Sequence, residues 1–405
     1  MATLSDPPQQ DTFRLSMLFN DTRYRAFTFQ GIALLLLITA IAYLGSNLAA
    51  NLRAAGLQLG FSFLYEPAGY DINQRLIEYD SQSTHLRAAI VGILNTLLVA
   101  FLACITATIF GVLAGVLRLS KNWLVSKLMA FYVEIFRNIP VLIWIVIIFT
   151  ITIAVLPAPR AFRGEDPEAT MLLGAFAFTN RGIYIPGPVW GPGSIVVVLT
   201  FLASLVGIWG YRRYATNLLY STGQMLPTFW PSLAIFFVPS ILMYFIMGMP
   251  IGLDYPELRG FNFRGGIQIG TPLIALWFAL SIYTGAFIAE NVRAGIQAVS
   301  KGQTEAAGAL GLRPNRIMNL VVLPQALRVI IPPLISQYLN ITKNSSLAIA
   351  VGYADITATL GGITLNQTGR AIECVLLLML FYLTISLSIS AVMNVYNKSV
   401  ALKER

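Results

Sequence analysis

Eight long apolar runs constrain what this chain of 405 residues can fold into. A helix needs about 20 mostly apolar residues to cross a bilayer, and we expect such helices at about 26–46, 87–117, 125–156, 194–211, 231–251, 271–295, 329–352 and 372–396. Hydrophobic residues make up 56% of the chain and charged residues only 11%, too apolar for a soluble domain. The sequence therefore predicts an all-α integral membrane protein with eight transmembrane helices.

Basic residues lie unequally in the loops on the two sides of such a bundle. One side holds Arg14, Arg23, Arg25, Arg118, Lys121, Lys127, Arg212, Arg213, Arg293, Lys301, Arg313, Arg316, Arg328, Lys398, Lys403 and Arg405. The other side holds Arg53, Arg75, Arg87, Arg160, Arg163, Arg181, Arg259, Arg264 and Arg370, largely offset by acids. The positive-inside rule puts both termini and residues 296–328 in the cytoplasm. Membrane topology thus explains the net charge of +9 better than binding of nucleic acid, which would need a basic patch.

Residue types that bind metals or catalyse reactions are scarce. Cys104 and Cys374 lie in apolar runs and the single histidine, His85, has no ligand partners nearby, so neither a disulfide framework nor a metal site is expected. No G-x-x-x-x-G-K-[ST] segment is present to cradle nucleotide phosphates. We therefore expect no catalytic residues, no cofactor and no enzymatic reaction in this chain.

Residues 300–328, on the predicted cytoplasmic side, read as two short helices joined by a turn. The positions that shape the turn and its surface are Ser300, Gln303, Glu305, Ala306, Ala307, Gly311, Arg313 and Pro314. A serine followed three residues later by glutamine predicts a capping box, and the glycine suits a left-handed helix end. The proline is placed to begin the second helix. Small alanines beside a glutamate make a knob that another protein's groove could accept.

This loop resembles the EAA loop of bacterial ABC importer permeases. The resemblance rests on Glu305-Ala306-Ala307, then Gly311, Val321 and Leu323-Pro324 at the family's spacing, with valine at position 321 where the family usually has isoleucine. Further blocks resemble polar amino acid permeases: residues 92–97, 132–140, 286–293 and 343–347. Residues 180–186 and 365–369 resemble the larger permease subunit of general L-amino-acid and glutamate/glutamine/aspartate/asparagine importers.

The resemblance implies a permease subunit of a type I importer for L-amino acids of broad range, in the bacterial inner membrane. Its implied partners are an ATPase subunit that holds ATP and Mg, a second and different permease, and a periplasmic amino-acid-binding protein. A five-helix core would comprise residues 87–156 and 271–405, with the coupling loop at 300–328. Residues 1–25 would be a cytoplasmic tail, 26–86 an added span with an external segment, and 157–270 an inserted external segment and helical hairpin.

Polar residues inside the seventh span suggest a substrate pathway. They are Asn340, Lys343, Asn344, Ser345 and Ser346. On a regular helix they would wrap most of its circumference, which is costly in lipid unless the segment is unwound, packed inside or lining water. Lys343 and the serine hydroxyls would suit a carboxylate and Asn344 an ammonium. The alternative is that Lys343 pairs with an acid such as Glu373 or with carbonyls.

Other features carry structural interpretations. Glu134 with Arg137, and Glu290 with Arg293, are expected to form ion pairs, and the glycines at 111 and 115 to pack against another helix. Two further function classes remain open. An ion-coupled secondary amino acid transporter would carry coupling-ion ligands in this chain, and a channel would form a selective pore in a homo-oligomer.

Overall fold

The computed structural model describes residues 17–54, 56, 59–164 and 166–400. Within these residues, eight helices are long and apolar enough to cross a membrane. They are Tyr24–Ala54, His85–Arg118, Val141–Phe162, Ser194–Thr222, Phe229–Ile246, Thr271–Gln297, Pro314–Val351 and Ala371–Val395. The predicted class of helical membrane protein and the eight predicted spans are confirmed.

The chain divides into two compact units, residues 1–62 and 63–405. The first unit contains α1 (Met17–Asn20) and α2 (Thr22–Ala54). Apolar side chains of α2 such as Leu35 are largely exposed, which suits contact with lipid tails. Most of the tail predicted at residues 1–25, and the C-terminal Lys403 and Arg405, lie outside the described residues.

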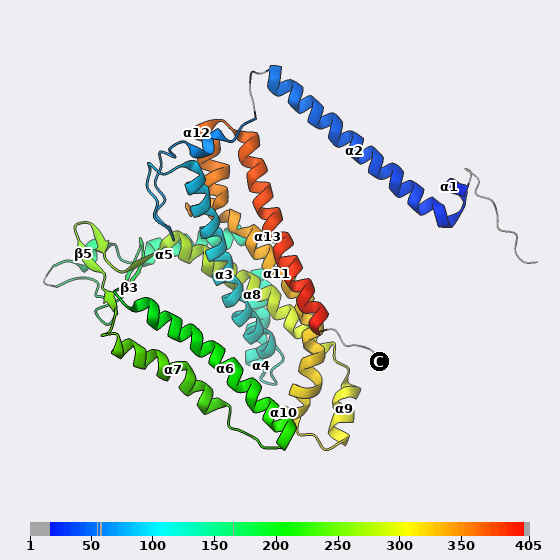
Figure 1. The fold of residues 1–405 in the computed structure, drawn as a ribbon, viewed down its shortest axis with the longest axis vertical. Coiled ribbons are helices and arrows are strands. Elements are labelled where there is room, and N and C mark those ends of the chain that lie inside the picture. Colours follow the sequence, from blue (N-terminus) through cyan, green and yellow to red (C-terminus); the bar gives the residue numbers. More distant parts are fainter. Residues whose placement is uncertain (1–16, 55, 57–58, 165, 401–405) are drawn as a thin grey trace, which may run out of the picture. The chain divides into compact units, whose positions relative to one another are not determined.

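The second unit holds the remaining elements (Figure 1). Its α-helices are α3 (His85–Arg118), α4 (Trp123–Asn138), α5 (Val141–Val155), α6 (Ser194–Thr222), α7 (Phe229–Ile246), α8 (Thr271–Gln297), α9 (Lys301–Ala309), α10 (Pro314–Ile317), α11 (Leu323–Asn344), α12 (Leu365–Thr368) and α13 (Ala371–Val400). Tighter and wider helical turns are η1 (Ser62–Tyr65, at the boundary of the units), η2 (Pro159–Phe162), η3 (Met318–Val322), η4 (Ser345–Val351) and η5 (Thr357–Thr364).

The core of this unit forms where α3, α5 and α11 pack against α8. Small residues let α3 and α8 approach closely: a Cβ at Gly111 would lie 2.5 Å from the Cβ of Ile288, and one at Gly115 would lie 2.6 Å from the carbonyl oxygen of Ala289. The predicted packing role of these two glycines is confirmed. The central helix α8 leads, after only three residues, into α9.

The expected third span, 125–156, is interrupted in the structure. It consists of α4 and α5, separated at Ile139 and Pro140. Only the second part is long and apolar enough to cross a membrane. The backbone of Ile139 is extended (φ −104°, ψ 131°) because the ring of a following proline disfavours the helical conformation. The proline also lacks the N–H that would continue the helix.

The helix that contains the seventh span begins earlier than the span predicted from sequence. Helical backbone runs without interruption from Pro314 to Val351 through α10, η3, α11 and η4. Pro332 and Pro333 lie inside α11 and do not end it. Neighbouring helices can hold a proline-containing membrane helix together by local adjustment of its hydrogen bonds, and here α3, α8 and α13 contact α11.

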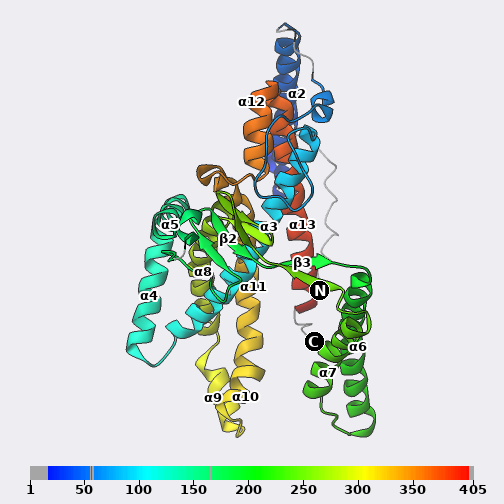
Figure 2. The same ribbon diagram turned by 90° about the vertical axis from the view of Figure 1, so that its left-hand side faces the viewer.

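Residues 157–270, predicted to be an insertion, contain short strands in addition to the expected helical hairpin α6–α7. The strands are β1 (Ala177–Thr179), β2 (Gly182–Ile185), β3 (Gly187–Trp190), β4 (Ile251–Asp254), β5 (Glu257–Arg259), β6 (Asn262–Arg264) and β7 (Ile267–Gly270). They pair antiparallel as β1-β2-β7, β3-β4 and β5-β6. Segments before and after the hairpin are thereby joined at its base, and β7 leads directly into α8 (Figure 2).

Candidate functional site

The loop after α8 forms the predicted elbow of two short helices, α9 and α10. Ser300 is the residue before α9, but its side chain makes no capping hydrogen bond, so that part of the capping-box prediction is wrong. The N–H of Gln303 instead donates to the backbone oxygen of Ser300 (3.1 Å). Gly311 adopts the predicted left-handed conformation (φ 78°). Arg313 then precedes Pro314, which begins α10 as predicted.

The turn at Gly311 is closed by backbone hydrogen bonds. The N–H of Gly311 donates to the oxygen of Gly308 (2.9 Å), and the N–H of Leu312 donates to the oxygen of Ala307 (3.3 Å). These bonds satisfy carbonyls that the end of α9 would otherwise leave free. The left-handed glycine thus fixes the direction in which the chain turns back toward α10.

The surface of this elbow combines a charge with exposed apolar side chains. Ala307 is buried against its neighbours, whereas Glu305 and Ala306 are exposed. Leu310 is 83% exposed at the tip, and Leu320 on the following turn is also exposed. Large apolar side chains exposed on the same short segment as a charge are typical of a surface that meets another protein.

Within the second unit, the elbow lies at the end opposite α12 (Figures 1 and 2). It is tied to two core helices, through the short link 298–300 to α8 and through unbroken helical backbone to α11. A displacement of the elbow would therefore move both helices.

Charged side chains join α3 to α8 near the elbow. Glu290 forms ion pairs with Arg118 and Arg293, and Arg293 Nη1 donates to Gln297 Oε1 (2.5 Å). The predicted pair of Glu290 and Arg293 is confirmed.

The second predicted ion pair, between Glu134 and Arg137, is wrong for the part of the chain that the structure describes. Arg137 lies over the ring of Phe287, with its guanidinium carbon 5.2 Å from the ring centroid. Packing of α4 against α8 places this aromatic face within reach of the guanidinium, which is attracted to it.

The predicted pathway residues lie where α11 gives way to the tighter turn η4. Lys343 and Asn340 are exposed, Asn344 and Ser346 are half-buried, and Ser345 is 0% exposed. Ser345 Oγ donates to the oxygen of Thr342 (2.7 Å), and Ser346 Oγ to that of Lys343 (2.8 Å). A hydroxyl has one hydrogen to donate, so both serines already use theirs within the helix.

The alternative partner for Lys343 is otherwise engaged. Glu373 forms an ion pair with Arg370 (3.4 Å), and Lys343 forms no salt bridge among the described residues. Its ammonium group is therefore available for another anion.

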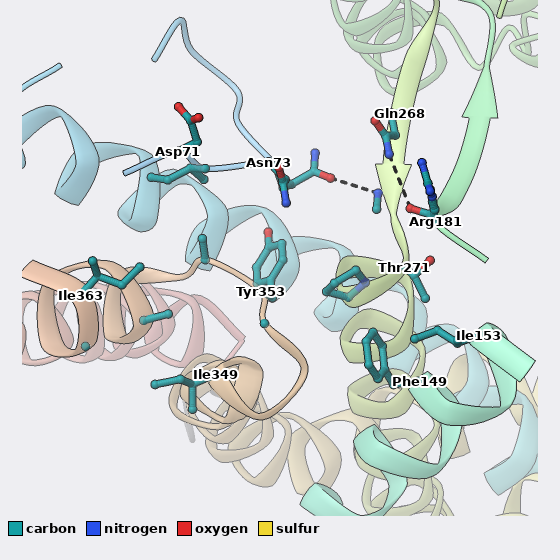
Figure 3. A pocket seen from close by; sticks show the side chains of 18 of the residues that line it. Asp71, Asn73, Phe149, Ile153, Arg181, Gln268, Thr271, Ile349, Tyr353 and Ile363 are labelled. Carbon is teal, nitrogen blue, oxygen red and sulfur yellow. Dashed lines mark hydrogen bonds between the residues drawn. The ribbon is translucent and has the colours of Figure 1, made fainter. Parts of the chain in front are cut away.

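A cavity of about 880 Å³ lies close to this segment but is not lined by it. Its walls come from residues 71–74, from α5, from the start of α8, from residues 180–270 and from residues 349–366. Polar side chains, including Asp71, Arg181 and Gln268, lie along one side, and Phe149, Ile153 and Ile349 lie along the other (Figure 3).

Hydrogen bonds hold the cavity walls together. Asn95 is fully buried on α3, and its Nδ2 donates to the backbone oxygens of Gln74 (2.7 Å) and Ala354 (2.9 Å). Gln74 Oε1 accepts from the N–H of Gly270 (3.2 Å), and Tyr353 Oη donates to the oxygen of Asn95 (3.0 Å). The segment before α3, the start of α8 and the loop after η4 are thus fixed to one another.

The buried carboxyl group of Asp355 helps to position η5, which forms another wall of the cavity. Asp355 Oδ1 accepts a hydrogen bond from the N–H of Ala358 (2.8 Å) at the start of η5, and burial raises the pKa of Asp355 to about 6. Ala358 lines the cavity, so this bond helps to place the η5 wall.

The cavity residues are not among the site residues predicted from sequence. A signal for them existed, because Arg181 and Asn180 belong to the block 180–186 and Asn366 to the block 365–369 that carried the resemblance to the larger permeases. What the sequence could not show is that the β2–β7 pairing brings the first block beside the start of α8.

Comparisons with known proteins agree with this architecture. Residues 200–402 match the family of the binding-protein-dependent transport system inner membrane component. The chain is 54% identical to the glutamate/glutamine/aspartate/asparagine transport system permease protein BztB of Rhodobacter capsulatus, over 100% of both chains. It is 44% identical to the general L-amino acid transport system permease protein AapQ of Rhizobium johnstonii, over 97% of this chain and 96% of that protein.

A solved structure, described as an amino acid ABC transporter with histidines, matches with a TM-score of 0.45 and 20% identity, over 78% of this chain and 95% of that one. The family match and the full-length relatives decide the assignment. This chain belongs to the family of inner membrane components of binding-protein-dependent transport systems.

Proposed function

We propose that this chain is a permease subunit of an ATP-driven importer of L-amino acids in the bacterial inner membrane, with both termini in the cytoplasm. The elbow α9–α10 carries this proposal, because it presents an exposed charged and apolar knob joined to two core helices. The full-length similarity to BztB and AapQ supports the substrate class. ATP and Mg would be held by a partner ATPase.

In this mechanism the partner ATPase binds Glu305, Ala306 and the turn around Gly311. Closure of the ATPase on ATP moves the elbow, and α8 and α11 follow because their backbones lead directly into it. The bundle then opens to the outside, where a periplasmic binding protein releases its amino acid. Hydrolysis returns the elbow and the bundle to the inward-open state.

A second, different permease would complete the pore. The chain's insertion, with its own strands and helical hairpin, makes its surface unlike that of a five-helix partner. Some relatives match only part of this chain. It is 33% identical to the glutamate/aspartate import permease GltJ of Escherichia coli over only 41% of its length. A heteromeric pore fits this asymmetry.

Reconstitution tests the proposal directly. Vesicles holding this permease, its second permease and the ATPase should take up amino acids only when ATP and the binding protein are supplied. Omission of the second permease should abolish uptake. Uptake driven by a proton or sodium gradient without ATP would instead identify a secondary transporter, and ATP-independent currents through this chain alone would identify a channel.

The segment Asn340–Ser346 remains our proposed inner part of the pathway, with Lys343 free to meet a carboxylate and Asn344 beside it. Replacement of Asn344 by aspartate adds a negative charge at a half-buried position. We expect preference to shift toward cationic amino acids by about tenfold, since a charge-assisted contact is worth about 1.5–3 kcal/mol. Competition assays in the assembled complex measure this shift.

Asn217→Asp is the matched control, because Asn217 is an exposed asparagine on α6, outside both the elbow and the proposed pathway. It should leave substrate preference unaltered. Unchanged preference in the Asn344 variant would remove residue 344 from the pathway.

A further inference from the structure

The large cavity on the external side has two chemically different faces. Along one side lie carboxamides together with Asp71 and Arg181, and along the other lie Phe149, Ile153, Ile349 and other apolar side chains (Figure 3). A free amino acid has the same division, because every one carries a carboxylate and an ammonium while its side chain varies. The cavity's volume of about 880 Å³ lies in the range of small-molecule sites.

The polar face offers both kinds of group that an amino acid needs, on adjacent residues. Arg181 Nη1 donates to the backbone oxygen of Phe261 (3.2 Å), which leaves most of its five N–H donors for a ligand. Asn180 Oδ1 is buried and has no hydrogen-bond partner in the part of the chain that the structure describes. Asn180 also lines the cavity, so an unused acceptor and an arginine come from neighbouring residues of the same wall.

Asp71 lies across the cavity from Arg181 (Figure 3). The two charges of one amino acid are separated by only a few bonds, so we assign the ammonium to Asn180, the sequence neighbour of Arg181, and not to Asp71. Gln268, whose Nε2 donates to the backbone oxygen of Arg181 (3.5 Å), holds this part of the wall in place.

We propose that this cavity is an external binding site for free α-amino acids, in which Arg181 binds the α-carboxylate, Asn180 Oδ1 accepts from the α-ammonium and the apolar face receives the side chain. This proposal rests on the proposed import function. It adds a binding site that the substrate would reach before the pathway at residues 340–346. It recognises what all amino acids share. The apolar face discriminates little between different side chains, so a broad substrate range follows.

The test measures ligand binding to the purified transporter complex in lipid nanodiscs, without the binding protein. The probes are L-glutamine and its α-amide, which lacks the carboxylate, and affinities are obtained by saturation-transfer-difference NMR. The unaltered complex should bind glutamine about tenfold more tightly than the α-amide, since charge-assisted hydrogen bonds are the stronger ones. In a Lys343→Gln background, which removes the other proposed carboxylate contact, Arg181→Gln should remove this discrimination and leave affinity for the α-amide unchanged.

Three further variants sharpen the assignment. Asn180→Val should weaken both ligands equally, because both retain the ammonium, and Arg181→Lys should restore part of the discrimination. Arg264→Gln is the matched control: Arg264 is an exposed arginine on β6 that does not line the cavity. It should bind both ligands as the unaltered complex does. Retained affinity for the α-amide shows that the Arg181 variant is folded.

The proposal is overturned if Arg181→Gln in the Lys343→Gln background still distinguishes the two ligands, or if the unaltered complex binds neither. Either result would leave the import function standing as long as the complete system still takes up amino acids with ATP. Failure of ATP-driven uptake would instead refute the import function itself, whatever the NMR titrations show.

Discussion

Replacement of Gly311 by leucine is expected to lower ATP-driven amino acid uptake by at least about tenfold, because a side chain in the left-handed conformation costs about 1–2 kcal/mol. Gly311 has φ 78° and ends α9 through the hydrogen bond to Gly308. A residue that avoids this conformation must redirect the chain toward α10 and displace the exposed tip at Leu310. Vesicle uptake by the reconstituted complex measures the loss, and membrane extraction checks that insertion is intact.

The chain offers a close control in Gly302. A Cβ at either glycine would meet nothing within 4 Å, and only Gly311 has a positive φ. Gly302→Leu should therefore support far more uptake than Gly311→Leu, and Gly311→Asn should recover part of the loss since asparagine tolerates the left-handed region. Normal uptake by Gly311→Leu would contradict a coupling role for this turn.

Glu305→Lys tests the charged side of the same surface and should release the ATPase.

The membrane spans could be predicted from sequence because their signal is local. A run of about 20 apolar residues satisfies the bilayer whatever its neighbours do, so all eight spans were found. Their ends were harder to predict. The break at Pro140 depends on a single residue's missing N–H, whereas Pro332 and Pro333 stay within a helix that its neighbours support.

The elbow and the cavity show why the site was only partly predictable. Gly311 and Pro314 act through their own backbone preferences, so their positions in the turn followed from sequence. The partner of Arg137 did not, because Phe287 reaches it only through packing of α4 on α8. The cavity depends on contacts between residues as distant in sequence as Gln74 and Gly270, which no local pattern contains.

A second large effect is expected at the contact of α3 with α8. A Cβ at Gly115 would lie 2.6 Å from the carbonyl oxygen of Ala289 and 2.8 Å from the Cβ of Val292. Gly115→Leu must therefore push the two helices apart, and overpacking of a close contact costs about 1–3 kcal/mol, or more where backbone must move. Thermal unfolding of the purified complex should show a clearly lowered midpoint.

Gly210→Leu is the matched control, because Gly210 also lies within a long membrane helix, α6, and has nothing within 4 Å of its Cβ position. It should keep the unfolding midpoint of the unaltered complex, and an equal midpoint for Gly115→Leu would show that the close approach contributes little.

The contact between α3 and α8 also affects transport. α8 leads into the elbow, and Glu290 on α8 binds Arg118 on α3 close to Gly115. Separation of the helices should therefore weaken transmission from elbow to bundle, so that ATP hydrolysis continues while uptake falls.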